Sequence, residues 1–184
     1  MTLRVEQVEG RRGVAAFVDA AWKVQSGRGT LWVPPLRAMV RDALDRRGNA
    51  FYRDADRALF VARRGTEVAG RIAAVENRWH NRHHGDRGGF FGFFECLDDR
   101  DTARALLAAA EAWLIGRGLT NVRGPMSPSM NHECGLLVDG FDTPPVLMTP
   151  WNPPYYGALI EDAGYGKVQD LLAYYIPAGD KLAV

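Results

Sequence analysis

The sequence predicts a mixed α/β fold, in which helices cover the faces of a β-sheet. Three observations lead to this class. Strand and helix patterns follow one another in the order β-α-α-β-β-β-α-β-α-β. Residues 90–97 are apolar on both faces, which is typical of a central strand. The helix expected at residues 102–117 has a start signal before its first residue and a stop signal after its last. No Gly/Ser-rich or Pro-rich linker divides the chain, so we expect one domain over residues 1–184.

In the first half of the chain, turn and helix-breaking residues separate short helices and strands. We expect strands at residues 2–8, 58–63 and 68–75, and helices at residues 11–25 and 36–47. Residues 26–29 break the first helix, and Pro34 with Pro35 opens the second. A turn at Gly65 joins the second and third strands into a hairpin.

The second half begins with a polar segment, residues 77–89, which we expect to form a loop. We then expect strands at residues 90–97, 121–123 and 170–176, helices at residues 102–117 and 155–163, and an irregular segment at residues 126–149. The aspartates that precede residue 102 cap the long helix, and Gly118 stops it. Gly92, inside the apolar strand, predicts a β-bulge.

Composition excludes several classes of protein. The chain has 184 residues, of which 47% are hydrophobic and 24% charged. No apolar run approaches the roughly 18 residues of a membrane span, and the first residues lack the apolar stretch of a secretory signal. Cys96 and Cys134 lie in apolar stretches, so we interpret them as reduced thiols of a cytoplasmic protein that does not enter a membrane.

The net charge of +1 conceals a polarised chain. Residues 1–87 carry 17 basic and 10 acidic side chains, whereas residues 88–184 carry 6 and 12. Arginines at positions 71, 78, 82 and 87 surround Trp79, a combination that can bind single-stranded nucleic acid. A single aromatic residue and no RNA-binding motif favour a solvated basic face, or a face that docks against the acidic half or a partner. We expect no nucleic acid.

A resemblance rests on the element order and on four polar motifs. The order is similar to that of the GNAT (acyl-CoA N-acyltransferase) fold. The motifs are residues 81–86, 89–95, 131–142 and 152–156. They resemble the N-terminal half of a family of uncharacterised tandem GNAT-like bacterial proteins, about twice this length. The resemblance implies a GNAT-like fold and acyl transfer from acetyl-CoA or another acyl-CoA to a small amine. As partners it implies a small-molecule substrate and either a second copy or the C-terminal GNAT half.

The resemblance also assigns catalytic roles. Glu95 follows the apolar run, where desolvation raises a carboxyl pKa, and it would be the general base for the amine. The alternative is that Glu95 pairs with an arginine of the basic half or ends the strand in water. A Gly92 bulge would free a backbone N–H for the acyl carbonyl. The usual acidic tyrosine position is Ile160 here, so Tyr156, which lies earlier on the same helix, is the substitute.

The resemblance places the donor at Gly92, Leu97 and Ala103. In the pyrophosphate motif of the family, Ala103 fits a position for a small residue, but Asp98 and Asp101 replace Arg/Gln and Gly. Carboxylates repel a pyrophosphate and already cap the helix that would bind it. Two functions therefore stay open: a GNAT-type acyltransferase, or a non-catalytic binding or scaffold module of the same fold that has lost the pyrophosphate loop.

Histidines raise a metal hypothesis. His80, His83, His84 and Asp86 supply enough ligands for zinc, and His132, Glu133 and Cys134 form a second group. The first cluster lies among arginines, which oppose a cation, so we expect no metal. Instead, the resemblance makes five residues candidates for lining the substrate site: His84, Asn131, Glu133, Asn152 and Tyr155.

Overall fold

A five-stranded sheet organises the computed structural model, which describes residues 2–26 and 31–174. The strands stand in the order β1 (Leu3–Val8), β2 (Ala55–Arg64), β3 (Glu67–Asn77), β4 (Gly88–Cys96) and β5 (Asn121–Arg123). Neighbours are antiparallel except β4 and β5, which run parallel and pair only from Gly88 to Phe90. A two-stranded ribbon, β6 (Met126–Ser127) and β7 (Glu133–Cys134), lies beside β4.

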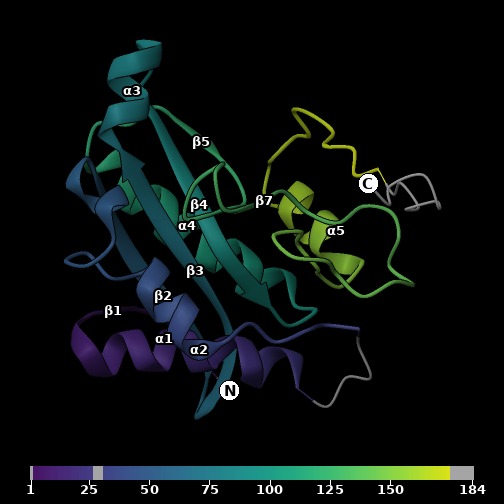
Figure 1. Cartoon of the computed structure of the whole chain (residues 1–184). Coiled ribbons are helices and arrows are strands. Elements are labelled where there is room, and N and C mark those ends of the chain that lie inside the picture. Colours follow the sequence, from purple (N-terminus) through teal and green to yellow (C-terminus); the bar gives the residue numbers. More distant parts are fainter. Residues whose placement is uncertain (1, 27–30, 175–184) are drawn as a thin grey trace.

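Helices cover both faces of this sheet (Figure 1). Their bounds are α1 (Gly10–Gln25), α2 (Arg37–Ala43), α3 (Arg78–His84), α4 (Arg100–Ile115) and α5 (Tyr155–Asp162), with a 3₁₀ turn η1 at Ala50–Arg53. Alternation along β2 divides the core. Leu59 and Val61 pack with α1 and α2, whereas Phe60 and Ala62 pack with α4 and α5. The predicted mixed α/β class is confirmed.

The structure corrects three predicted elements. The polar segment 77–89 contains α3. The Asn77 side chain caps this helix by accepting a hydrogen bond from the His80 N–H, and Gly85, in the left-handed conformation, ends it. The second helix ends at Ala43, because a turn follows in which Asp45 accepts a hydrogen bond from the Arg47 N–H. Residues 170–174 form no strand and are exposed, and the rest of the strand predicted at 170–176 lies outside the described residues.

A bulge interrupts β4 next to Gly92. Arg71 pairs with Glu95 and Ala73 with Gly92, so two residues of β4, Phe93 and Phe94, oppose one residue of β3. Phe93 has φ 49°, in the left-handed region. The Phe93 N–H turns out of the ladder and donates to Ser127 Oγ at 2.8 Å. No helix in the described ranges is long and apolar enough to cross a membrane.

Gly92 is required by the packing of the β6–β7 ribbon, and this predicts an effect on stability. A Cβ at Gly92 would lie 1.8 Å from the Met126 carbonyl oxygen. We therefore expect Gly92→Ala to lower the free energy of unfolding by about 1–3 kcal/mol in urea titrations, because the backbone of the ribbon must move. Gly157→Ala is the matched control: it meets nothing within 4 Å on α5 and should be neutral or slightly stabilising. Equal effects of the two changes would contradict this interpretation.

Candidate functional site

A cluster of buried polar side chains lies just beyond the β4 bulge. Gln25 comes from the end of α1, Arg71 from β3, Glu95 from β4 and Tyr156 from α5. Arg71 and Glu95 are cross-strand partners, which sets them on the same face of the sheet. Four elements distant in sequence thus meet at one carboxylate.

Both oxygens of Glu95 are engaged. Oε2 accepts hydrogen bonds from Gln25 Nε2 at 2.6 Å and from Tyr156 Oη at 2.8 Å. Oε1 lies 3.7 Å from Arg71 Nη2, and the side chain of Glu95 is 14% exposed. Burial raises the pKa of Glu95, whereas the Arg71 charge and the two hydrogen bonds oppose that shift. Burial likewise lowers the pKa of Arg71, and Glu95 opposes that change.

Tyr156 links this carboxylate to the edge of the sheet. Its hydroxyl donates to Glu95 and accepts from the Cys96 N–H at 2.9 Å, a backbone donor that β5 does not reach. Burial and the neighbouring Glu95 charge raise the pKa of Tyr156 well above its usual value, so the hydroxyl keeps its proton. The next residue, Tyr155, donates its hydroxyl to the Cys96 carbonyl at 2.9 Å.

The cluster leaves some of its polar atoms without partners. Gln25 Oε1 and Arg71 Nε are buried and make no hydrogen bond within the described part of the chain. Buried polar atoms are nearly always hydrogen-bonded, and exceptions concentrate where function requires them. This incompleteness is consistent with a site that completes its hydrogen bonds with a polar ligand.

Glu133 faces the same cluster from the β6–β7 ribbon. Its backbone pairs with Ser127, the residue whose hydroxyl accepts the N–H of the bulge. The residue is exposed to solvent, while neighbouring protein partly desolvates its carboxyl, which also interacts with the charges of Glu95 and Arg71. Desolvation and the Glu95 charge raise the pKa of Glu133 to about 7, against the effect of Arg71. The structure therefore brings Glu95, Tyr156 and Glu133 together.

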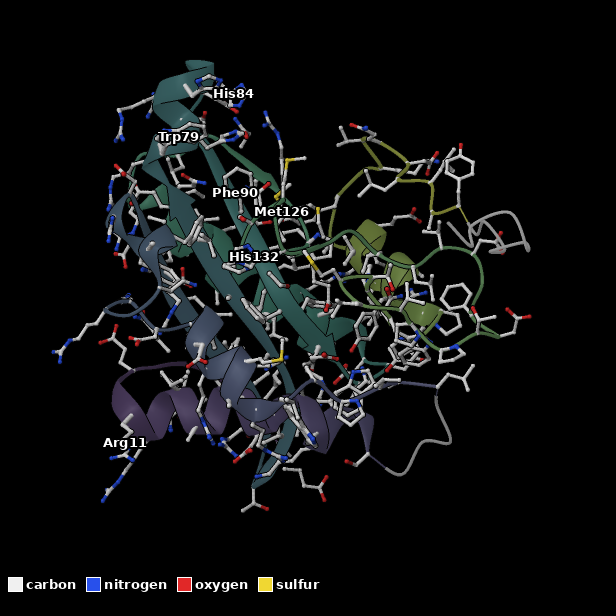
Figure 2. The ribbon with its side chains drawn as sticks, viewed as in Figure 1. Arg11, Trp79, His84, Phe90, Met126 and His132 are labelled. Atoms are coloured by element: carbon white, nitrogen blue, oxygen red, sulfur yellow. The ribbon has the colours of Figure 1, made fainter. Side chains whose placement is uncertain are left out.

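His84 and Asn131 lie in a separate cavity of about 390 Å³ at the other end of β4. Phe51, Phe90 and Met126 form its apolar wall. Figure 2 shows Phe90, Met126 and His132 following one another along the sheet below α3, which carries Trp79 and His84, whereas Arg11 lies on α1 at the far end. The cavity and the Glu95 cluster share strand β4 and residues 126–133.

The other candidate residues have structural partners. Asn152 is buried. Its side-chain amide accepts a hydrogen bond from the Leu137 N–H and donates to the carbonyls of Leu137 and Pro153, so all of these bonds are to the backbone. Ala103 is fully buried at the start of α4. Leu97, which follows the end of β4, is partly buried and packs against both cores. None of these three joins the Glu95 cluster.

The N-terminus of α4 is closed by its own cap. The Asp99 carboxylate accepts from the N–H groups of Asp101 and Thr102 and from the Thr102 hydroxyl. Arg64 Nη2 lies 2.6 Å from the same carboxylate. The donors that a pyrophosphate would use are thus already bonded, as the sequence predicts for aspartates at this position.

The histidines of α3 pack on one another and on neighbouring rings. His84 contacts both His80 and His83, and His83 stacks on Trp79. Across the residues that the structure describes, no three His, Cys, Asp or Glu side chains converge as metal ligands would.

The alternative that Glu95 pairs with an arginine of the basic half is what the structure shows, and that arginine is Arg71. The sequence does not single out Arg71 among the arginines of the expected basic face, whereas the structure leaves it 4% exposed, and the sequence gives no role to Gln25. The position of Arg71 inside an otherwise apolar strand was still a usable signal, because a buried charge requires a partner. Gln25 offered no such signal, since a polar residue at the end of a helix usually faces water.

The Tyr156 hydroxyl provides a test of the cluster. Tyr156→Phe removes the donor to Glu95 and leaves the buried Cys96 N–H without an acceptor. We expect a loss of about 1–3 kcal/mol of unfolding free energy in chemical denaturation. Tyr165→Phe is the control, because that hydroxyl makes one hydrogen bond, to a partly buried Glu111, and its loss should be smaller. A Tyr156→Phe protein as stable as the wild type would disprove the bridging role.

No family model matches the chain. It is 38% identical over 149 residues to protein YghO of Escherichia coli strain K12. It is 42% identical over 144 residues to a protein of Caulobacter vibrioides named bacterial ceramide synthase. These alignments cover 81% and 78% of this chain. The chain spans only 38% of the length of each of these relatives.

Two solved structures share the architecture. AAC(6')-Iy in complex with a bisubstrate analogue, CoA-S-monomethyl-acetylneamine, superposes with a TM-score of 0.54 at 12% identity, over 97% of this chain and 100% of that one. The aminoglycoside acetyltransferase meta-AAC0020, from an uncultured soil sample and in complex with trehalose, gives 0.50 at 8% identity, over 96% and 97%. At such identities the likeness concerns the fold. The chain has the GNAT acetyltransferase fold that its element order predicted.

Proposed function

We propose that residues 1–184 form a GNAT-type acyltransferase domain that transfers an acyl group from an acyl-CoA to an amine. One observation carries the proposal: a largely buried carboxylate, Glu95, hydrogen-bonded to Tyr156, lies beside a bulge on the β4 edge that β5 leaves unpaired. Acyl transfer to an amine needs a carboxylate or other base to manage the proton and a donor for the carbonyl oxygen, and the Glu95 cluster with the Phe93 N–H offers groups of both kinds.

The thioester is expected along the unpaired edge of β4. There the Phe93 N–H would donate to the acyl carbonyl oxygen, in the position that Ser127 Oγ holds at 2.8 Å. A backbone N–H aimed at the developing oxyanion is worth several kcal/mol in the transition state of acyl transfer, about 2.7–4 kcal/mol per donor. Because Ser127 Oγ holds this position and the Met126 carbonyl packs against Gly92, the ribbon would have to move away from β4 to admit the substrate.

The acceptor is expected to reach this edge from the His84–Asn131 cavity. Its volume of about 390 Å³ lies within the usual range of small-molecule pockets. His84 and Asn131 provide polar groups, and Phe51, Phe90 and Met126 provide apolar surface for an alkyl part. The name of the Caulobacter relative, ceramide synthase, supports an acceptor of this kind, because a ceramide is the amide of a long-chain amino alcohol.

The alternative is a GNAT-fold module that binds or supports a partner without catalysis. The closed N-terminus of α4 favours it, since Asp99 and Arg64 use the pyrophosphate position. The partner would be a second copy, or the remaining length that the curated relatives possess.

Donor binding distinguishes the two functions. We expect acetyl-CoA or octanoyl-CoA to raise the melting temperature of the protein in a dose-dependent manner, because a ligand of the native state stabilises it by mass action. Free CoA is the control, because it shows how much of the thermal shift depends on the acyl group. The absence of any shift at millimolar concentrations of each acyl-CoA would leave the non-catalytic module as the better account.

Glu95 provides the second test. We expect Glu95→Gln to keep the acyl-CoA shift and to lower the turnover number about tenfold or more, because the amide keeps the shape of the side chain but loses its charge. Release of thiol from acyl-CoA in the presence of primary amines measures turnover. If Glu95→Gln abolished donor binding, Glu95 would be structural.

A further inference from the structure

We propose that Glu133 is the catalytic residue that takes the proton from the acceptor amine, and that Glu95 is a positioning residue that acts through it. This inference rests on the proposed acyl transfer and adds a division of labour between two carboxylates. It reverses the roles that the sequence suggested, in which Glu95 was the base and Glu133 lined the substrate site.

The hydrogen bonds of Glu95 argue against direct contact with an amine. Its Oε2 accepts from Gln25 and Tyr156, and its Oε1 faces Arg71. With 14% of the side chain exposed, a substrate nitrogen would have to enter beside the Arg71 guanidinium at Oε1 or displace a donor from Oε2. Displacement of Tyr156 would leave its buried hydroxyl without an acceptor, and displacement of Gln25 would leave its Nε2 only the longer hydrogen bond to Tyr156 Oη, at 3.2 Å.

Glu133 has the opposite properties. It is exposed, and its carboxylate makes no hydrogen bond or ion pair with the residues that the structure describes. Its backbone pairs with Ser127, whose hydroxyl marks the proposed position of the acyl oxygen. An accessible carboxylate is therefore fixed, by a two-residue ribbon, next to the reacting carbonyl. Asn131 of the acceptor cavity lies only two residues earlier.

The surrounding charges suit a base that works near neutral pH. The charged groups that face Glu133 are Glu95 on β4 and Arg71 on β3, while Tyr156 on α5 stays protonated. Arg71 pairs with Glu95 and acts on Glu133 only through its charge, so ionisation of one carboxylate opposes ionisation of the other. The resulting pKa of Glu133, about 7, is close to the value at which a general base is most effective.

The proposed step balances as follows. The ammonium form of the acceptor gives one proton to the Glu133 carboxylate. The neutral amine nitrogen then forms a bond to the thioester carbon, and the C–S bond breaks. The second proton of the nitrogen passes to the leaving thiolate, which departs as the thiol of CoA. Glu133 returns its proton to water, so the products are an amide, a thiol and one proton.

The experiment compares Glu133→Gln, Glu133→Asp, Glu133→Ala and the wild type, with octanoyl-CoA and octylamine as the substrates. Removal of a general base should lower the turnover number by about 10²–10⁴-fold and leave the octanoyl-CoA thermal shift unchanged. Glu133→Asp should recover part of the rate. Added formate should partly rescue Glu133→Ala, because the vacated position is open to solvent. Glu161→Gln, the same change at an exposed carboxylate on α5, is the control and should keep full activity.

The pH profile tests the role of Glu95. In the wild type, the rate should rise with pH through a midpoint near 7, as Glu133 loses its proton. Glu95→Gln removes a negative neighbour, which favours the ionised form of Glu133. The residual activity should therefore show a midpoint at lower pH, and a carboxyl-carbon NMR titration of Glu133 should show the same downward shift. An unchanged midpoint in Glu95→Gln would show that the Glu95 charge does not act on Glu133 and would overturn this role.

The outcomes separate the two claims. If the wild type transfers no acyl group from any acyl-CoA to any amine, the proposed function fails, and this inference fails with it. If the wild type is active and Glu133→Gln keeps its rate and its pH profile, acyl transfer stands and Glu133 is not the base. Activity lost in Glu133→Gln together with donor binding would also overturn the inference.

Discussion

The unpaired edge of β4 is the constraint on which the rest of the site depends. β5 accompanies β4 only from Gly88 to Phe90, so the backbone groups beyond that point need other partners. Ser127 takes the Phe93 N–H, Tyr156 takes the Cys96 N–H, and Tyr155 donates to the Cys96 carbonyl. These three hydrogen bonds attach the β6–β7 ribbon and α5 to the sheet. The proposed substrate position and the proposed catalytic groups thus both lie where the strand pairing is incomplete.

The charge balance inside the cluster follows from burial. Arg71 is 4% exposed, and a buried guanidinium without a counter-charge is strongly unfavourable. Glu95 supplies that charge, and the Phe17 carbonyl and ring support the guanidinium from the α1 side. Because Arg71 is committed to Glu95, it can neutralise Glu133 only in part. This commitment of Arg71 to Glu95 accords with the pKa of Glu133, which desolvation and the Glu95 charge raise to about 7 against the effect of Arg71.

Much of the fold could be predicted from the spacing of apolar residues and from the residues that begin or end helices and strands. β1, β4, α1, α4 and α5 lie within a few residues of their expected bounds, because each has a clear apolar pattern and a Gly, Pro or Asp at its ends. The cap pair of α3, Asn77 and Gly85, was present in the sequence but was outweighed by the polar residues between them. At the site, Glu95 and Tyr156 were predicted separately. Their hydrogen bond, and the parts played by Gln25 and Arg71, depend on contacts between residues up to 131 positions apart, which no local pattern encodes.

The closed end of α4 limits how a donor could be held. The Asp99 carboxylate accepts from the helix donors and pairs with Arg64 where a pyrophosphate would bind. A phosphate there would have to displace a carboxylate that already has three donors and a guanidinium. Affinity for an acyl-CoA must then come from the thioester end, along β4, and from the acyl chain rather than from the nucleotide. A domain that holds its donor in this way would discriminate by acyl length more strongly than by the presence of the CoA phosphates, since apolar burial adds about 0.8 kcal/mol for each methylene.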